Sequence, residues 1–301
     1  MSQSRRRFLR NLGLSAAALM LPNRLHADPL SGSPTTADRE RLAAWLRTLR
    51  REGLPAARGP LGRAVARVGE LALGTPYRAS TLEEYLGEGG VPSAEPATCY
   101  LTVFDCVTLV ESAQAVARTA ARAGAGWDGF VREMERMRYR GGVRNGYASR
   151  LHYFSEWIGD NARRGLVRDL GHELGATEDR RPLRFMGTHR SAYAALKDDA
   201  TYDAILRMER TLDDQPRHLI PTDRIPGVMG RIQTGDVLAF ATSIEGLDAS
   251  HTGLAYRDRA GVLRVLHAPL SGGNVTISRG DLHAYVAGIR RSTGILVARP
   301  L

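Results

Sequence analysis

The pattern of apolar residues changes about two thirds of the way along the chain, and this change restricts the fold more than any other feature. Up to residue 213 apolar residues recur at the spacing of helices that bury one face, and the predicted helices span 38–49, 62–73, 107–122, 127–138, 155–164 and 191–213. Later, short runs of β-forming residues lie between Gly, Asp and Pro, and they predict strands at 236–240, 251–256, 263–267, 274–277 and 294–298. Helices followed by antiparallel strands are typical of an α+β fold.

The net charge first suggests a nucleic-acid partner, because the chain carries a formal charge of +10. Five arginines lie in the first 27 residues, which contain no acidic residue, so the rest of the chain has a charge of +5. The remaining arginines are scattered among acids, as in 132–136 (REMER), whereas nucleic-acid-binding proteins gather basic residues on one face. We therefore expect no nucleic-acid partner, although a mildly basic protein can act beside an anionic polymer.

The N-terminus has the order of an export signal. Residues 4–10 (SRRRFLR) resemble the twin-arginine motif, a short apolar stretch runs from Leu12 to Leu21, and cleavage is expected after Ala27. The apolar stretch is shorter than the roughly 20 residues that cross a bilayer, as in a removable signal. Since no cysteine lies near its end, we expect no stable membrane anchor. These features predict export by the twin-arginine machinery and a periplasmic mature protein.

Behind the leader, the sequence predicts a tether and one domain. Residues 28–37 are rich in Ser, Pro and Thr, which favours an irregular segment. Residues 38–301 contain no internal repeat and can bury a large core without disulfides or metal ions. The polar segment 178–184 predicts a surface loop. The expected organisation is a signal peptide at 1–27, a tether at 28–37 and a single domain at 38–301.

The two cysteines, Cys99 and Cys106, have different surroundings. Asp105 precedes a helical run, and aspartate is one of the residues preferred at a helix N-cap. Cys106 is therefore expected in the first helical turn. The free N–H groups and the dipole of a helix start favour a thiolate, which is how a nucleophilic cysteine can form without a metal. A disulfide with Cys99 and an inert core cysteine remain open as alternatives.

A cysteine nucleophile needs a base and a group that orients the base. His251 begins one predicted strand and His267 ends the next, with a turn at 257–261 between them. A hairpin there can bring the two imidazoles together, so that one takes the thiol proton while the other fixes its tautomer. The alternative is that each histidine is a structural residue of its strand.

In combination, these residues resemble the NlpC/P60 superfamily of papain-like cell-wall hydrolases, and more narrowly its N-acetylmuramoyl-L-alanine amidase-like branch. The superfamily pattern is found in 104–111 (FDCVTLVE), 235–236 (GD), 248–254 (DASHTGL) and 266–268 (LHA). The narrower branch is indicated by 74–77 (GTPY), 147–154 (YASRLHYF), Trp157 and 185–186 (FM). The resemblance extends over roughly residues 70 to 295.

The resemblance implies an enzyme that cleaves the amide between N-acetylmuramic acid and L-alanine, in peptidoglycan or its turnover fragments. Its implied residues are Cys106 as the nucleophile, His251 as the base and His267 as the orienting group. The implied fold is papain-like, with a nucleophile helix packed on a C-terminal antiparallel sheet or barrel and extra helices inserted between Cys106 and the histidines. No cofactor is implied.

Residues that contact the substrate are sought among the aromatic and polar side chains of the same segments. Tyr77, His152 and Tyr153 could line a cleft for sugar and peptide groups, and Arg150 could bind a peptide carboxylate. A packing role on a helix explains the residues near 150 equally well, and a structural role is favoured for Glu111.

Other functions stay open. A peptidoglycan endopeptidase that cuts within the stem peptide would use the same fold, and a non-catalytic peptidoglycan-binding module or a disulfide-stapled structural protein would need no catalysis. A metal site is not indicated, because His172-Glu173 lacks the second histidine of a metalloprotease helix and no C-x-x-C pair exists.

Overall fold

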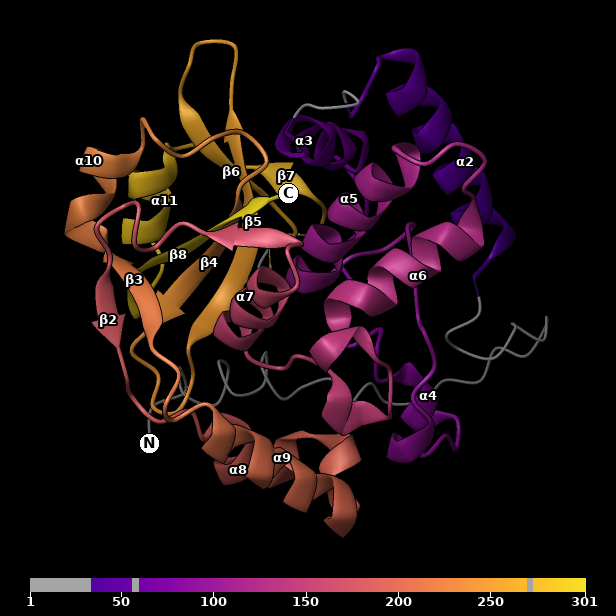
Figure 1. The fold of residues 1–301 in the computed structure, drawn as a ribbon, viewed down its shortest axis with the longest axis vertical. Helices are drawn as coiled ribbons and strands as arrows, with labels where there is room; N and C mark the ends of the chain where they lie inside the picture. Colours follow the sequence, from indigo (N-terminus) through magenta and orange to yellow (C-terminus); the bar gives the residue numbers. More distant parts are fainter. Residues whose placement is uncertain (1–33, 56–59, 270–272) are drawn as a thin grey trace.

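The computed structural model describes residues 34–55, 60–269 and 273–301 (Figure 1). The predicted signal peptide lies outside the described residues. The predicted tether extends too far, because α2 (Thr36–Arg51) already begins within it. The side chain of Thr35 accepts a hydrogen bond from the N–H of Asp38 at 3.1 Å, and the Asp38 carboxylate accepts one from the N–H of Thr35 at 3.1 Å. This capping box satisfies two N–H groups that an uncapped helix start would leave without a partner.

The longer helices lie close to their predicted ranges, at α3 (Gly62–Leu71), α5 (Cys106–Ala120), α6 (Trp127–Arg138) and α7 (Phe154–Arg163). The helix predicted over 191–213 is shorter, because Asp198 caps α9 (Asp199–Thr211) by accepting a hydrogen bond from the N–H of Thr201 at 2.8 Å. Four short helices were not predicted: α4 (Glu84–Gly87), α8 (Phe185–Thr188), α10 (Ile225–Val228) and α11 (Leu282–Ala287).

In the described residues the eight strands form one antiparallel sheet. Seven of them follow the order β2-β3-β8-β4-β5-β6-β7, and β1 is also paired to β8. The strands are β1 (Val167–Asp169), β2 (Thr177–Asp179), β3 (Arg217–Pro221), β4 (Val237–Thr242), β5 (Ala249–Arg257), β6 (Leu263–His267), β7 (Thr276–Ile277) and β8 (Ser292–Pro300). The sheet is open, since β2 and β7 are its two edges, so the expectation of a barrel is wrong. The α+β class and all five predicted strands are confirmed.

Alternating residues of the central strand β4 pack on opposite faces of the sheet. Leu238 and Phe240 join a core cluster with the apolar residues of α10 and α11. Val237 and Ala239 join a different cluster with the apolar residues of α2, α3, α5, α6 and α7. Figure 1 shows α10 and α11 on one side of the sheet and α3 and α5 on the other. The period-two pattern of a strand buried on both faces therefore explains why the sheet lies between two layers of helices.

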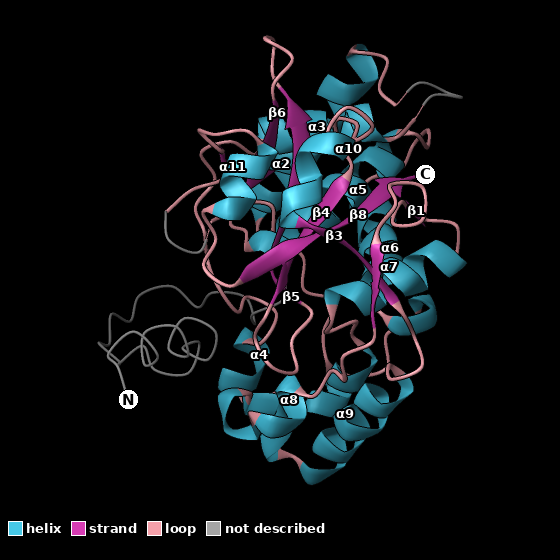
Figure 2. Cartoon of the chain, turned by 90° about the vertical axis from the view of Figure 1, so that its left-hand side faces the viewer, coloured by secondary structure: helices cyan, strands magenta, loops and turns pink. Residues whose placement is uncertain are grey.

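A third apolar cluster surrounds α8 and α9, which lie beyond one end of the sheet in Figure 2. These helices belong to the stretch between Cys106 and His251, as expected for inserted helices. The loop predicted over 178–184 is only partly correct, because Glu178 and Asp179 belong to edge strand β2 and Leu183 is buried. Short, charged edge strands avoid unwanted pairing, but the same charges make them resemble loops in a sequence.

Candidate active site

Cys106 is the first residue of α5, as the sequence predicts. Asp105 caps the helix: its carboxylate accepts the N–H of Thr108 at 2.7 Å, and its own N–H donates to the Thr108 hydroxyl at 2.9 Å. The hydroxyl of Thr252 donates to the carbonyl oxygen of Cys106 at 2.9 Å. The start of α5 is thus held against β5, directly beside the residue that follows His251.

The Cys106 side chain is half-buried. Burial, and then the neighbouring Asp105 carboxylate, raise the pKa of Cys106 to about 12. The N–H groups of Val107 and Thr252 favour the thiolate, as the sequence analysis expected of a helix start, but their effect on the pKa is smaller. Burial therefore has the larger effect and favours the thiol.

The other cysteine takes no part in this site. Cys99 and Cys106 are both free thiols in the structure, which contradicts the disulfide alternative. Cys99 is only 3% exposed, and burial raises the pKa of its thiol to about 11. Its place in the core fits an inert residue.

The two histidines of the predicted hairpin do meet. Strands β5 and β6 pair antiparallel, and Nε2 of His251 lies 2.8 Å from Nδ1 of His267. Their rings are edge to face, with centroids 5.1 Å apart. Burial lowers the pKa of His267 to about 4, and burial together with the charge of His267 lowers the pKa of His251 to about 3. Both imidazoles are therefore neutral near pH 7.

The two ring nitrogens of His251 differ in their hydrogen bonding. Its Nδ1 is buried and has no hydrogen-bond partner among the described residues. An imidazole whose Nε2–H donates to His267 keeps a lone pair on Nδ1. Of the two nitrogens, Nδ1 is thus the one that can accept a proton from another group.

Sequence reasoning missed Tyr285, which lies on the unpredicted helix α11. Its hydroxyl is 3.1 Å from Nδ1 of His267. Burial, and then the charge that Cys106 would carry as a thiolate, raise the pKa of Tyr285 above its usual range, which also indicates that the phenol lies near the thiol. The one available signal was Asp281, which caps α11 by accepting the N–H of Ala284 at 2.8 Å.

Tyr77 is the predicted substrate-binding residue that lies at this site. Its backbone forms a parallel bridge with Phe104, and the next N–H, that of Arg78, donates to the carbonyl of Phe104 at 2.9 Å. The half-buried phenol has its pKa raised by burial and by the charges of Cys106 and Asp105. The structure therefore brings Tyr77 and Cys106 together across more than 25 residues of sequence.

The other predicted substrate contacts are already bonded within the fold. Arg150 is 7% exposed, donates to Glu95 at 2.7 Å and pairs with Glu83. Tyr153 is 1% exposed, and its hydroxyl donates to Glu209 at 2.6 Å. These contacts occupy the groups that would bind a ligand and favour the packing alternative for Arg150 and Tyr153.

His152 is half-buried beside these residues. Its Nε2 lies 2.9 Å from the carbonyl oxygen of Tyr147, and the two rings pack with centroids 4.5 Å apart. Burial and the charge of Arg150 lower the pKa of His152 well below its usual value. One of the two ring nitrogens of His152 is thus bound to the backbone.

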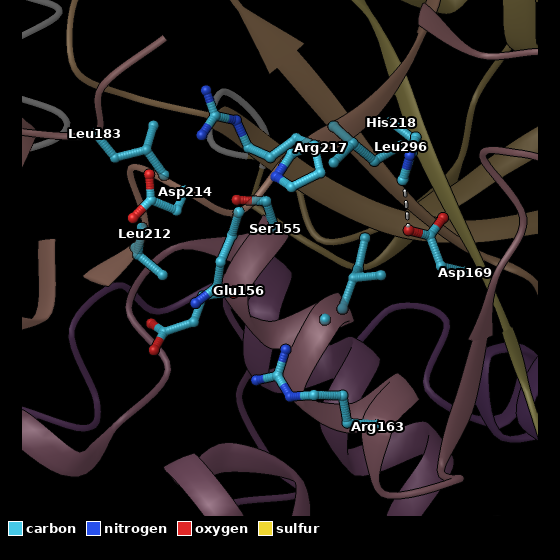
Figure 3. Close-up of a pocket in the computed structure, with 14 residues that line it drawn as sticks. Ser155, Glu156, Arg163, Asp169, Leu183, Leu212, Asp214, Arg217, His218 and Leu296 are labelled. Atoms are coloured by element: carbon cyan, nitrogen blue, oxygen red, sulfur yellow. Dashed lines mark hydrogen bonds and ion pairs between the residues drawn. The ribbon is translucent and has the colours of Figure 1, made fainter. Parts of the chain in front are cut away.

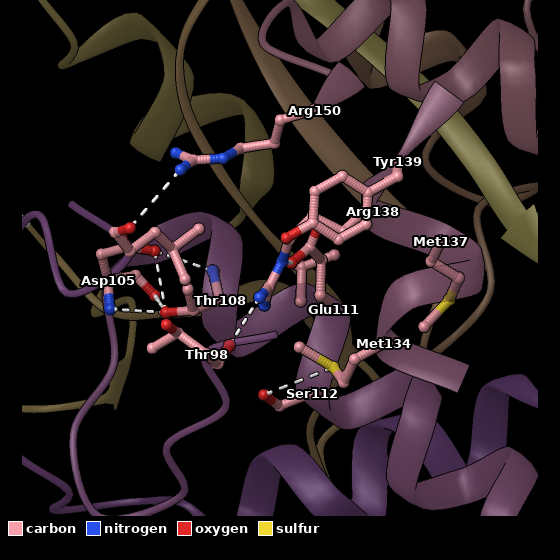
Figure 4. Close-up of polar contacts among 12 residues, drawn as sticks. Thr98, Asp105, Thr108, Glu111, Ser112, Met134, Met137, Arg138, Tyr139 and Arg150 are labelled. Carbon is pink, nitrogen blue, oxygen red and sulfur yellow. Dashed lines mark hydrogen bonds and ion pairs between the residues drawn. The ribbon is translucent and has the colours of Figure 1, made fainter. Parts of the chain in front are cut away.

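Glu111 has the structural role that the sequence favours. Its carboxylate accepts a hydrogen bond from Nε of Arg138 at 2.7 Å, and both residues are 2% exposed (Figure 4). Arg138 also donates to the carbonyl of Thr98 at 2.6 Å. The ion pair thus joins α5, which carries Cys106, to α6, and Arg138 also links α6 to the segment before α5.

A cavity of about 250 Å³ lies elsewhere, between α7 and β3 (Figure 3). It contains none of the predicted catalytic residues, and its one histidine, His218, lies 3.4 Å from the carboxylate of Asp169. Within the described ranges, no group of three or more His, Cys, Asp or Glu side chains is arranged to hold a metal ion. No helix in that part of the chain is long and apolar enough to cross a membrane.

Comparison with known proteins adds a family to this geometry. The family model described as N-acetylmuramoyl-L-alanine amidase-like matches residues 67–295. No curated protein matches the chain.

Among solved structures, an N-acetylmuramoyl-L-alanine amidase from Bacteroides uniformis is similar, with a TM-score of 0.73 and 27% identity over 80% of this chain and 99% of that one. A candidate xylanase from Bacteroides fragilis has a TM-score of 0.70 and 33% identity, over 77% of this chain and 99% of that one. A Legionella pneumophila protein is 18% identical and shares the fold, with a TM-score of 0.64 over 88% and 94% of the two chains.

Proposed function

The chain belongs to the N-acetylmuramoyl-L-alanine amidase-like family, and we propose that it hydrolyses the amide between N-acetylmuramic acid and L-alanine in peptidoglycan or its turnover fragments. The family match over residues 67–295 carries this proposal, because it includes Cys106 and the hydrogen-bonded pair of His251 and His267. We also propose that Cys106 is the nucleophile, in a papain-like arrangement of the NlpC/P60 type.

The first step would be attack of the Cys106 sulfur on the carbonyl carbon of the lactyl amide. Nδ1 of His251 would take the thiol proton, since this nitrogen has no partner among the described residues. Transfer before attack is unfavourable, because the pKa of the thiol is about 12 and that of His251 about 3. Proton transfer should therefore accompany formation of the carbon–sulfur bond, as in general-base catalysis.

The oxyanion of the tetrahedral intermediate needs donors near the sulfur. The first N–H groups of an α-helix have no partner within the helix, and at the start of α5 the N–H of Thr108 is already bound to Asp105. The N–H of Cys106 is therefore a suitable donor to the oxyanion. Half-buried Tyr77, near the thiol, is a suitable contact for the substrate.

Collapse of the intermediate would break the carbon–nitrogen bond. His251 would pass its proton to the amine of L-alanine, and the peptide would leave while the lactyl group stays on Cys106 as a thioester. A water molecule would then attack the thioester, giving one proton to His251 and its hydroxyl to the lactyl carbonyl carbon. The carboxylic acid that forms when the sulfur leaves would lose its proton to the solvent. The sulfur would leave and regain the proton from His251, which returns both residues to their neutral resting forms.

The experiment is a digest of purified muropeptides with the wild-type protein, Cys106→Ala and Cys99→Ala, analysed by mass spectrometry. We expect free peptides that begin with L-alanine from the wild type and from Cys99→Ala, and none from Cys106→Ala. The matched control loses the other, buried cysteine and so separates loss of the nucleophile from loss of a thiol in general.

Each other outcome of the digest would indicate a different function for the protein. Products that retain L-alanine on the sugar would indicate an endopeptidase that cuts within the stem peptide. Unchanged cleavage by Cys106→Ala would exclude this cysteine as the nucleophile. Binding of peptidoglycan without cleavage by any of the three proteins would indicate a non-catalytic module, and sugar release from xylan would indicate a glycosidase.

We further propose that residues 1–27 direct the protein to the periplasm by the twin-arginine route. The supporting observation is the motif at residues 4–10, in a segment that contains five arginines and no acid. Replacement of Arg5 and Arg6 by lysine keeps the charge and should leave the protein in the cytoplasm, as cell fractionation would detect. Periplasmic recovery of this variant would contradict the proposed route.

A further inference from the structure

One nitrogen of the histidine pair has two partners. Nδ1 of His267 lies 2.8 Å from Nε2 of His251 and 3.1 Å from the hydroxyl of Tyr285. Among the described residues it is also the one hydrogen-bond partner found for that hydroxyl. The tyrosine comes from α11, whereas the histidines lie on β5 and β6, so the contact is a tertiary one.

The two neutral imidazoles can share their protons in two ways. In the first arrangement His251 carries its proton on Nε2 and donates to Nδ1 of His267, which leaves the lone pair of His251 on Nδ1. In the second, His267 carries its proton on Nδ1 and donates to His251, whose own proton is then on Nδ1. A thiol proton can be accepted by His251 only in the first arrangement.

We propose that Tyr285 is a positioning residue whose hydroxyl donates to Nδ1 of His267 and so holds the pair in the first arrangement. The hydroxyl needs an acceptor for its proton, and the one lone pair on Nδ1 of His267 supplies it, shared with the Nε2–H of His251 in a three-centre hydrogen bond. If Nδ1 carried a proton instead, the Tyr285 proton would have no acceptor within the described parts of the chain. This role rests on the proposed function, in which His251 is the base.

The surroundings of the three rings favour this role. Phe240 packs against two of them, with its centroid 5.5 Å from His251 and 5.3 Å from Tyr285. A proton on Nδ1 of His251 would be a buried donor without a partner in the described residues, and such donors are rare in folded proteins. Because burial keeps the pKa of Tyr285 above its usual range, the hydroxyl remains a donor at neutral pH.

The test is nitrogen NMR of histidine-labelled protein, which reports which ring nitrogen of each histidine carries the proton. Wild type, Tyr285→Phe and the control Tyr256→Phe are compared, with His251→Asn and His267→Asn assigning the signals. Tyr256 also donates one hydrogen bond, to Glu70 at 2.9 Å, and among the described residues no hydrogen bond or ring contact joins it to the histidine pair.

We expect Nδ1 of His267 to be unprotonated in the wild type and in Tyr256→Phe. In Tyr285→Phe the ratio of the second arrangement to the first should rise roughly three- to tenfold, the equivalent of one hydrogen bond. On muropeptides kcat should fall by up to the same factor, with KM unchanged, because the substrate does not bind to the lost hydroxyl.

The proposal would be overturned by His267 signals that are the same in wild type and Tyr285→Phe. A fall in kcat alongside those unchanged signals would indicate a structural role for Tyr285. The NMR measurement needs no substrate, so it separates the two proposals. A wild type that fails to cleave muropeptides would refute the proposed function, while a shift of the signals in Tyr285→Phe would still establish the control of the tautomer.

Discussion

Alkylation of Cys106 should become steadily faster with rising pH, because burial holds this residue in its thiol form. A pKa of about 12 lies five pH units above neutrality, so about one molecule in 100,000 carries the thiolate at pH 7. Iodoacetamide reacts with the thiolate. Its rate with Cys106 should therefore increase about tenfold for each pH unit between 6 and 11.

The assay follows incorporation of iodoacetamide by mass spectrometry in a Cys99→Ser background, which leaves one cysteine to modify. Asp105→Asn tests the second cause of the high pKa. Asparagine can still cap α5, but it removes the carboxylate whose charge raises the pKa of Cys106, so its rate profile should move to lower pH. The matched control is Asp198→Asn, which changes the cap of α9 and should leave the profile unchanged.

A rate that is constant between pH 5 and 9 would refute this reasoning. It would indicate a thiolate already formed at neutral pH, as the position at a helix start by itself suggests, and would mean that the N–H groups of Val107 and Thr252 outweigh burial. Equal profiles for wild type and Asp105→Asn would instead remove the carboxylate from the explanation.

Three further outcomes follow from buried groups. Glu111→Leu leaves the Arg138 guanidinium unpaired in the core and should lower the free energy of unfolding, measured in urea, by about 3–5 kcal/mol. The double variant with Arg138→Met should recover most of this loss. A single variant as stable as the wild type would contradict the burial of this pair. Because His251 and His267 have folded pKa values of about 3 and 4, the unfolded chain binds more protons than the folded one below pH 6.5. The stability contributed by the two histidines should be complete above that pH and fall towards pH 4 by up to about 1.4 kcal/mol per pH unit for each histidine. Asparagine at both positions should flatten this slope. Tyr153→Phe should cost about 1–3 kcal/mol of stability, because it leaves a buried acceptor without its donor, and should leave KM for muropeptides unchanged; a raised KM would return Tyr153 to the substrate site.

Much of the fold could be predicted because its signals are local. The apolar spacing of α6 and the β-forming run of β6 each give the observed bounds, Trp127–Arg138 and Leu263–His267. Strands β1 to β3 were missed because they are short and carry charged residues, as at Glu178 and Arg217. Strands β1 and β3 pair with β8, which lies more than 70 residues further along the chain, and β2 pairs with β3.

The site was predictable to the same extent. Asp105 and Cys106 form a local pattern, and a hairpin follows from two neighbouring strands, so the helix start and the meeting of His251 with His267 were both foreseen. Tyr285 was not, because a short helix reaches the histidines only through tertiary packing. No local pattern shows that Glu83 and Glu95 occupy the guanidinium of Arg150.

The sequence by itself therefore determines where the helices and the main strands lie, which cysteine begins a helix and which histidines can pair, because each depends on neighbouring residues. The tertiary structure decides that the sheet stays open, which polar side chains are already bonded, and which protonation states the site adopts. Those properties depend on burial and on contacts between distant segments. The Cys106 thiol illustrates the difference: its place at a helix start favours the thiolate, but desolvation in the folded protein has the larger effect and keeps its proton in place.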